Sequence, residues 1–187
     1  LLKRLAAAKR ELSPDLVAYV GREILAGLVY SHTGARDASG TALRVVHRDL
    51  CPANVLCSRS GQVKIADFGI ARALRDTDTS RTRTVAGHLG YMAPEQVRAE
   101  NIDERWDVYA AGVILWELFA LKPMFSRGSE AQTLLAIMAG DVPSITSVRP
   151  DLDLRWHAFL ARATDLDPAS RFPSAKTMLD ALEALAD

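Results

Sequence analysis

Apolar residues recur at the spacing of α-helices over much of the chain. The first clear helix begins at Ser13, which can cap an N-terminus, and Pro14 fits the first helical position because the N–H it lacks has no partner there. Asp15 suits the positive end of the helix dipole. The pattern predicts a helix to about Ser31 whose buried face holds Leu16, Val17, Val20, Ile24, Leu25, Leu28 and Val29.

Helical spacing returns in the second half of the chain. It predicts helices over residues 95–99, 106–121, 129–139, 153–164 and 174–186, and a basic helix should end near residue 10. The inward positions would be Val108, Gly112, Leu115 and Leu118 in the second of these, Leu154, Ala158, Leu160 and Ala161 in the fourth, and Met178, Leu179, Leu182 and Leu185 in the fifth.

Short apolar or alternating runs predict three strands. They lie at residues 45–46, at residues 55–57 and at residues 62–66, and Ser60 and Gly61 form a turn between the last two. This hairpin would end at Asp67. Residues 33–42 and 70–92 lack periodicity and predict loops. The expected fold class is therefore α+β, mainly α-helical, with a short β-hairpin.

The composition narrows the class of protein and the compartment that we expect. With 187 residues the chain can form one domain, and 23 basic residues balance 23 acidic ones, so no global field attracts nucleic acid or an anionic membrane. No apolar run approaches the roughly 20 residues of a membrane helix. Cys51 and Cys57 lack the spacing of a metal site and make no disulfide framework. We expect a soluble, cytoplasmic segment without nucleic-acid or membrane contacts.

Three motifs carry the chemistry. They are His47-Arg48-Asp49 with Asn54 five residues later, Asp67-Phe68-Gly69, and Ala93-Pro94-Glu95. Phosphoryl transfer needs a carboxylate that orients the attacking hydroxyl and accepts its proton, and hard oxygen ligands that hold metal ions on the phosphates. Asp49 suits the first task, and Asn54 and Asp67 suit the second.

In this order and spacing the motifs resemble the eukaryotic-like bacterial Ser/Thr protein kinases. The resemblance implies that residues 1–187 form the larger, C-terminal lobe of a kinase catalytic domain. It also implies transfer of the ATP γ-phosphate to Ser or Thr of protein substrates, with autophosphorylation and with Mg²⁺.

The resemblance assigns a role to each candidate residue of the catalytic loop. Asp49 would be the base, and Arg48 would meet a phosphate on the activation segment. Asn54 and Asp67 would hold Mg²⁺ at the nucleotide phosphates. Phe68 would pack under the site. Gly69 would let the backbone turn, and His47 would be structural.

Other residues would support the site. Glu95 and Arg171 match the two partners of a buried ion pair. Asp107 resembles an acid that accepts hydrogen bonds from the catalytic-loop backbone, and a plain helix N-cap is the alternative for it. The candidate phosphorylation sites in the activation segment are Thr82 and Thr84, followed by Thr79.

Two residues depart from the family pattern. Cys51 replaces the usual lysine two residues after the catalytic aspartate, and His88 replaces the usual threonine of the substrate-docking loop. The family geometry brings His88 near Asp49. We hypothesise that His88 supplies the positive charge that the lysine would have given, and the alternative is a hydrogen bond to Asp49 alone.

The resemblance also leaves a part of the kinase unmatched. The Gly-rich loop, the strand lysine and the hinge of an N-terminal lobe are missing from the sequence, so the chain alone should be inactive. The missing N-lobe is thus an expected partner, beside a protein substrate. A pseudokinase or binding scaffold is one alternative, although Asp49, Asn54 and Asp67 are all present. A small-molecule phosphotransferase is another, and Ala93-Pro94-Glu95 with a Thr-rich segment argues against it.

Overall fold

The structure, a computed structural model, describes residues 11–68, 88–100, 102–125 and 127–186. Within this part the fold is mainly helical and contains one antiparallel sheet of 2 strands. The expected combination of helices with a short β-hairpin is therefore confirmed.

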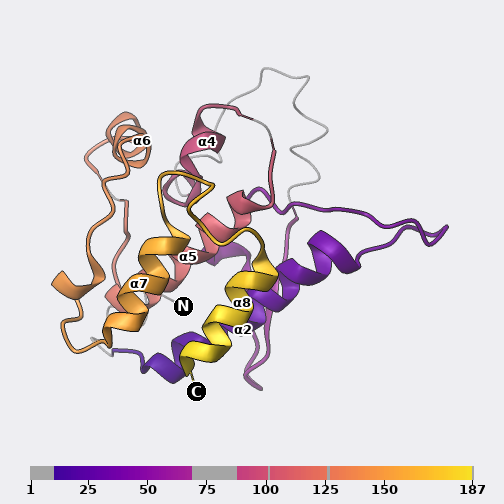
Figure 1. Ribbon diagram of the computed structural model, residues 1–187, viewed down its shortest axis with the longest axis horizontal. Coiled ribbons are helices and arrows are strands. Elements are labelled where there is room, and N and C mark those ends of the chain that lie inside the picture. The colour runs from indigo at the N-terminus through magenta and orange to yellow at the C-terminus, as the bar shows by residue number, and fades with distance from the viewer. Residues whose placement is uncertain (1–10, 69–87, 101, 126, 187) are drawn as a thin grey trace.

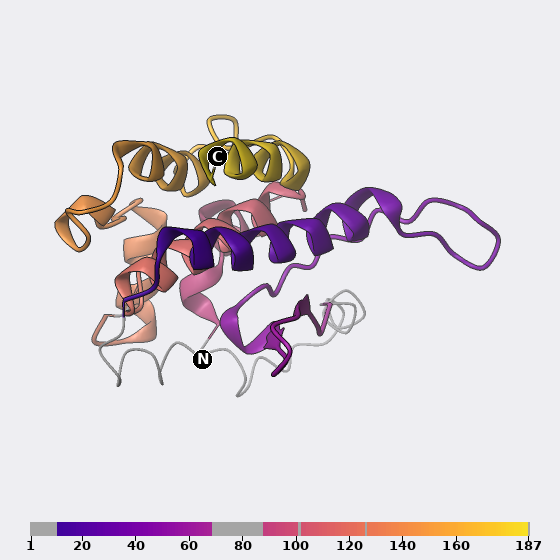
Figure 2. The ribbon, with the colours of Figure 1, turned by 90° about the horizontal axis from the view of Figure 1, so that it is seen from below.

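One helix is surrounded by the others. This is α5 (Arg105–Ala120), in which every residue from Trp106 to Phe119 is buried. The helices α2 (Pro14–Val29), α7 (Leu154–Ala163) and α8 (Ala175–Ala186) pack against it, and α2 also packs along α8 (Figures 1 and 2). An apolar surface on all sides is what a helix needs to be stable in such a position.

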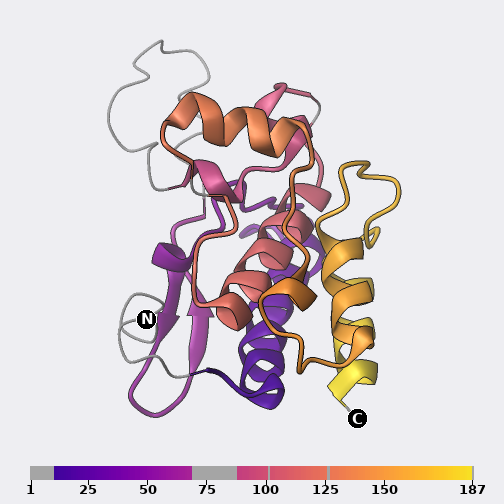
Figure 3. The same cartoon turned by 90° about the vertical axis from the view of Figure 1, so that its left-hand side faces the viewer.

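Shorter elements gather at the end of the molecule where α5 begins. They are α4 (Pro94–Val97) and the turn Leu89–Tyr91, and α6 (Glu130–Met138) packs across both (Figure 3). Two further short turns, Pro52–Asn54 and Ile145–Ser147, precede β1 and α7. Ser129 and Asp153 cap α6 and α7 with their side chains, as Ser13 caps α2.

The β-hairpin lies on the opposite side of α2 from α8 (Figure 2). Strand β1 (Val55–Cys57) pairs with β2 (Val63–Ile65), and Val55 lies opposite Ile65. A side chain on Gly27 of α2 would meet Ile65 at 3.0 Å, so the glycine allows the hairpin to approach the helix. The predicted hairpin is confirmed: β1 has the expected bounds, and β2 is one residue shorter at each end than expected.

The other predicted strand is wrong. Val45 and Val46 take no part in a ladder with any described residue, and the Val45 N–H donates to the Ser31 carbonyl instead, at 3.0 Å. The preceding helix also ends differently, since α2 stops at Val29 and continues as a π-helical turn, Tyr30–Gly34. The predicted loop at 33–42 contains a bridge between Arg36 and Ala42.

The buried face of α7 was predicted correctly only at Leu160, which is 2% exposed. Leu154 is 74% exposed, and Ala158 and Ala161 are exposed as well. The face that packs is formed by Trp156, Phe159, Leu160 and Ala163. Aromatic volume decides the outcome, because Trp156 packs edge-on against Phe119 of α5, with ring centroids 4.9 Å apart.

Candidate active site

The backbone of the predicted catalytic loop is held by a buried carboxylate. Asp107 lies in the first turn of α5 and is 1% exposed. Its Oδ2 accepts the His47 N–H at 2.7 Å, and its Oδ1 accepts the Arg48 N–H at 2.9 Å. Glu104, not Asp107, occupies the N-cap position of α5, so the Asp107 carboxylate serves the loop rather than its own helix.

A third partner of Asp107 was not found from the sequence. His32, buried in the π-helical turn after α2, places its Nε2 at 2.7 Å from Asp107 Oδ2. Its Nδ1 lies 3.4 Å from a Glu104 carboxylate oxygen. The contact joins residues 75 positions apart, and local periodicity cannot indicate such a pair.

His47 links the catalytic loop to the second motif. The Asp49 N–H donates to its Nδ1 at 3.4 Å, so this nitrogen carries no proton, and Nε2–H donates to the Ala66 carbonyl at 2.9 Å. The imidazole also packs on Phe68, with ring centroids 4.6 Å apart. The direction of the Asp49 backbone and the segment before Asp67 are thus tied to one buried ring.

The two predicted metal ligands lie at the same end of the hairpin, Asn54 directly before β1 and Asp67 two residues after β2. The Ala66 N–H donates to the Asn54 carbonyl at 2.9 Å, which brings Asn54 beside the residue that precedes Asp67. The Asn54 side-chain N–H₂ donates to the Asp49 carbonyl at 2.9 Å, so its amide oxygen is left to accept. Asp67 is exposed and has a left-handed backbone, with φ of 57°.

These donors fit Mg²⁺ chemically. A carboxylate and an amide oxygen, completed by water and phosphate oxygens, make the hard ligand set that Mg²⁺ prefers. Among the described residues there is no cluster of three or more His, Cys, Asp or Glu that could hold a metal alone.

Asp49 faces His88 in a shallow pocket whose walls also include Gln96 and Trp106. The His88 Nδ1 lies 3.1 Å from one carboxylate oxygen of Asp49 and 3.2 Å from the other. Both side chains are partly open to solvent, at 24% and 23% exposure. The nearly equal distances are those of one N–H shared between two acceptors.

Cys51, the second departure from the family pattern, is 1% exposed.

The buried Glu117 carboxylate accepts two hydrogen bonds near the catalytic loop. The hydroxyl of the half-buried Tyr91 donates to its Oε2 at 2.6 Å, and the Met124 N–H donates to its Oε1 at 2.9 Å. Burial raises the pKa of the Glu117 carboxyl, and these two hydrogen bonds offset part of the rise. The pKa of the Tyr91 hydroxyl is raised mostly by burial, next by the neighbouring Glu117 carboxylate, and least by Cys51.

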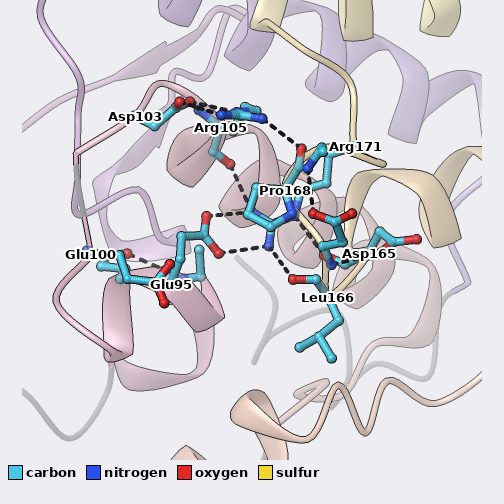
Figure 4. A network of polar contacts seen from close by, with 12 residues as sticks. Glu95, Glu100, Asp103, Arg105, Asp165, Leu166, Pro168 and Arg171 are labelled. Atoms are coloured by element: carbon cyan, nitrogen blue, oxygen red, sulfur yellow. Dashed lines mark hydrogen bonds and ion pairs between the residues drawn. The ribbon is translucent and has the colours of Figure 1, made fainter.

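Glu95 and Arg171 form a bidentate ion pair, with N–O distances of 2.7 and 2.8 Å (Figure 4). The side chain of Arg171 is 0% exposed and that of Glu95 is 6% exposed. The guanidinium also donates to the carbonyls of Asp165, Leu166 and Arg105. The pair therefore fastens α4 to the loop between α7 and α8 and to the start of α5.

A second pair continues this network. Arg105 donates to both carboxylate oxygens of Asp103 and to the Pro168 carbonyl (Figure 4). The hydrogen bond from Arg105 lowers the pKa of Asp103. Of the predicted site residues, Gly69, Thr79, Thr82 and Thr84 lie outside the described residues.

The comparison with protein families settles the membership. The family described as protein kinase domain matches residues 1–182. The chain belongs to the protein kinase family. The resemblance to eukaryotic-like bacterial kinases, stated from the motifs, is thereby confirmed.

Three relatives illustrate the similarity, and each is a bacterial protein kinase. The chain is 39% identical to tyrosine-protein kinase MasK of Myxococcus xanthus over 96% of its length. It is 34% identical to a probable serine/threonine-protein kinase of Streptomyces coelicolor and to serine/threonine-protein kinase PknL of Mycobacterium tuberculosis, over 100% of its length in both cases. It spans 28%, 27% and 44% of these three proteins.

No helix in the described part of the chain is both long and apolar enough to cross a membrane.

Proposed function

We propose that the chain is the C-terminal lobe of a protein kinase that transfers the γ-phosphate of ATP to Ser or Thr of protein substrates, itself included. Asp49 orients the substrate hydroxyl and accepts its proton. The observation that carries this proposal is the arrangement of three groups: Asp49 is partly open to solvent, its carbonyl accepts from Asn54, and the hairpin brings Asn54 beside Ala66, the residue before Asp67.

Asn54 and Asp67 are the residues that would hold Mg²⁺. When bound, the ion would neutralise negative charge on the phosphates. The protein prepares for this by fixing the Asn54 amide through its N–H₂ group, which leaves the oxygen free to face a cation.

Arg48 is proposed to receive the phosphate of a phosphorylated activation segment, with Thr82, Thr84 and Thr79 as acceptors. A guanidinium binds a phosphate with paired, charge-assisted hydrogen bonds, and this is how phosphorylation orders a loop. Mass spectrometry of the active kinase would identify the occupied sites.

The N-terminal lobe is a required partner in this proposal. The residues that grip the adenine and the α- and β-phosphates in kinases are not in the sequence, so residues 1–187 alone should have no useful activity. Joined to such a lobe, the same residues would act as an enzyme.

The test uses the full reading frame that encodes this chain. The purified protein is incubated with labelled ATP, Mg²⁺ and a generic acceptor protein such as casein, with Asp49→Asn as the matched control and residues 1–187 alone as a second one. We expect label only with the unaltered full-length protein. Equal labelling by Asp49→Asn would overturn the proposal, and no labelling by any form would favour a binding scaffold.

The acceptor hydroxyl is read from the same experiment. Acid hydrolysis of the labelled protein separates phosphoserine, phosphothreonine and phosphotyrosine. We expect the first two, although one relative is named a tyrosine-protein kinase. Label on tyrosine alone would correct the proposed specificity and leave the phosphotransfer intact.

A further inference from the structure

The peptide before the proposed base has a strained backbone. Arg48 has a φ of 66°, in the left-handed region that residues other than glycine seldom adopt. Such a conformation persists only where the surroundings enforce it. The structure shows what enforces it, on both sides of Arg48.

Asp107 holds the side of Arg48 toward His47. It accepts the Arg48 N–H at 2.9 Å and the preceding N–H, that of His47, at 2.7 Å. This contact reaches the loop from α5.

Gln96 holds the other side. Its side-chain N–H₂ donates to the Arg48 carbonyl at 2.8 Å. That carbonyl belongs to the peptide group whose N–H is that of Asp49, and the Asp49 N–H itself donates to His47 Nδ1 at 3.4 Å. Both polar groups of the peptide between Arg48 and Asp49 are therefore fixed, and with them the direction in which the Asp49 side chain leaves the backbone.

Gln96 is placed for this task by the helix that carries it. It lies in α4, directly after Glu95, whose carboxylate pairs with Arg171. Its amide oxygen accepts the Ala93 N–H at 3.4 Å, which leaves its N–H₂ directed at the Arg48 carbonyl. The ion pair anchors the helix, and the next residue reaches from it to the catalytic loop.

We propose that Gln96 is a positioning residue for Asp49. Gln96 acts by donating to the Arg48 carbonyl, and so holds the left-handed backbone from the side of α4. The inference rests on the proposed function of Asp49 as the base. The competing explanation is that Gln96 only closes the first turn of α4 through the Ala93 N–H.

One substitution separates the two explanations. Gln96→Glu keeps an oxygen for the Ala93 N–H and places negative charge at a helix start, where it is favourable. It removes the donor to Arg48 and sets a carboxylate against a carbonyl oxygen. Gln96→Met removes both contacts, and Gln62→Glu, at an exposed residue of the hairpin turn, makes the same chemical change away from the site.

The kinetic test uses the full-length kinase at neutral pH. We expect Gln96→Glu to lower kcat at least about tenfold, with the KM for ATP within about twofold of wild type and the unfolding temperature unchanged. As the pH is lowered toward the ordinary pKa of a glutamic acid side chain, the new carboxyl gains a proton that it can donate to the Arg48 carbonyl. The kcat ratio of Gln96→Glu to wild type should therefore rise. The ratio for Gln96→Met should stay low at every pH.

A second measurement does not depend on activity. Hydrogen exchange of the amides of His47, Arg48 and Asp49 should quicken about tenfold in Gln96→Glu and stay unchanged in Gln62→Glu. A kcat within twofold of wild type for Gln96→Glu, or unchanged exchange in this loop, would overturn the positioning role. An inactive wild-type kinase would instead count against the proposed function, and the exchange result would still decide whether Gln96 holds the loop.

Discussion

Several residues of the predicted site are held by partners far away in sequence rather than by their neighbours. Arg48 and Asp67 both have a left-handed backbone, with φ of 66° and 57°. In the case of Arg48, the side chains of Gln96 and Asp107 hold the conformation. A glycine at position 48 would relax the strain but would also widen the range of directions open to Asp49.

His88 is one of the two residues that depart from the family pattern. If its imidazole supplies the charge that a lysine would have given, His88→Ala in the full-length kinase should lower kcat by about tenfold or more.

The control places a lysine at position 51, where the family usually has one. Cys51→Lys in the His88→Ala background should restore part of the lost kcat, although Cys51 is buried and the larger side chain must find an exit to the pocket. An unchanged kcat in His88→Ala would reduce His88 to a plain hydrogen-bond partner of Asp49.

Glu117 gives a prediction about pH and stability. Burial raises the pKa of this carboxyl above its ordinary value of 4.5, so the folded state binds its proton more tightly than the unfolded state does. The free energy of unfolding of wild type, relative to Glu117→Gln, should therefore grow as the pH falls from neutral toward 4.5 and should then level off.

Urea denaturation at several pH values measures this difference. Glu183→Gln, on the exposed side of α8, is the matched control and should show little of the trend. The opposite trend for Glu117, with wild type gaining as the pH rises, would mean that the hydrogen bonds from Tyr91 and Met124 outweigh the burial.

At the scale of elements, the clearest energetic statement concerns the contact between α4 and Arg171. Glu95→Gln leaves the Arg171 guanidinium buried without its counter-charge, and the expected loss is about 3–5 kcal/mol of unfolding free energy. Arg171→Met should cost a similar amount for the reverse reason.

The double variant tests the coupling. With Glu95→Gln and Arg171→Met combined, no buried charge is stranded, so the loss should be clearly smaller than the sum of the two single losses. Additive losses, measured by urea denaturation, would mean that the two side chains act independently despite the bidentate contact.

The elements also show how far sequence reasoning reaches. Ser13 predicted the start of α2 within one residue, because capping is a local interaction. Helical spacing placed the starts of α6 and α7 within one residue as well. Local patterns failed at Val45 and Val46, since a strand needs a partner that periodicity does not name.

The same distinction applies to the site. The motifs, through the family that they resemble, named Asp49, Asn54 and Asp107 as candidates, and the catalytic and metal-binding roles stay predictions. His32 and Gln96 were missed, because their contacts with Asp107 and Arg48 cross 75 and 48 positions and stand in no such run. Only the packing of α2, α4 and α5 around the catalytic loop makes those contacts visible.

At the scale of the whole molecule, residues 1–187 without an N-lobe should self-associate. Leu56 on the hairpin, next to the Asn54 end of the site, is 56% exposed and would be covered by the proposed lobe. Sedimentation velocity at tens of micromolar should show species larger than a monomer, and Leu56→Ser should reduce them.

The matched control is Leu154→Ser. Leu154 is 74% exposed on α7, on the other side of α2 and α5 from the hairpin (Figure 2), so its replacement should leave the association unchanged. A clean monomer for the unaltered chain would count against an apolar surface left open by a missing lobe.

The burial of α5 has a consequence for timing. Asp107 near its start and Glu117 near its end both belong to a helix that is buried from Trp106 to Phe119, and we expect the amides of such a helix to exchange only when the whole domain opens. The supports of the catalytic loop should therefore be among the slowest parts of the molecule to fluctuate. On the time scale of a catalytic cycle the backbone of the catalytic loop would stay rigid. Control over activity would then have to come from the groups that bind to the loop.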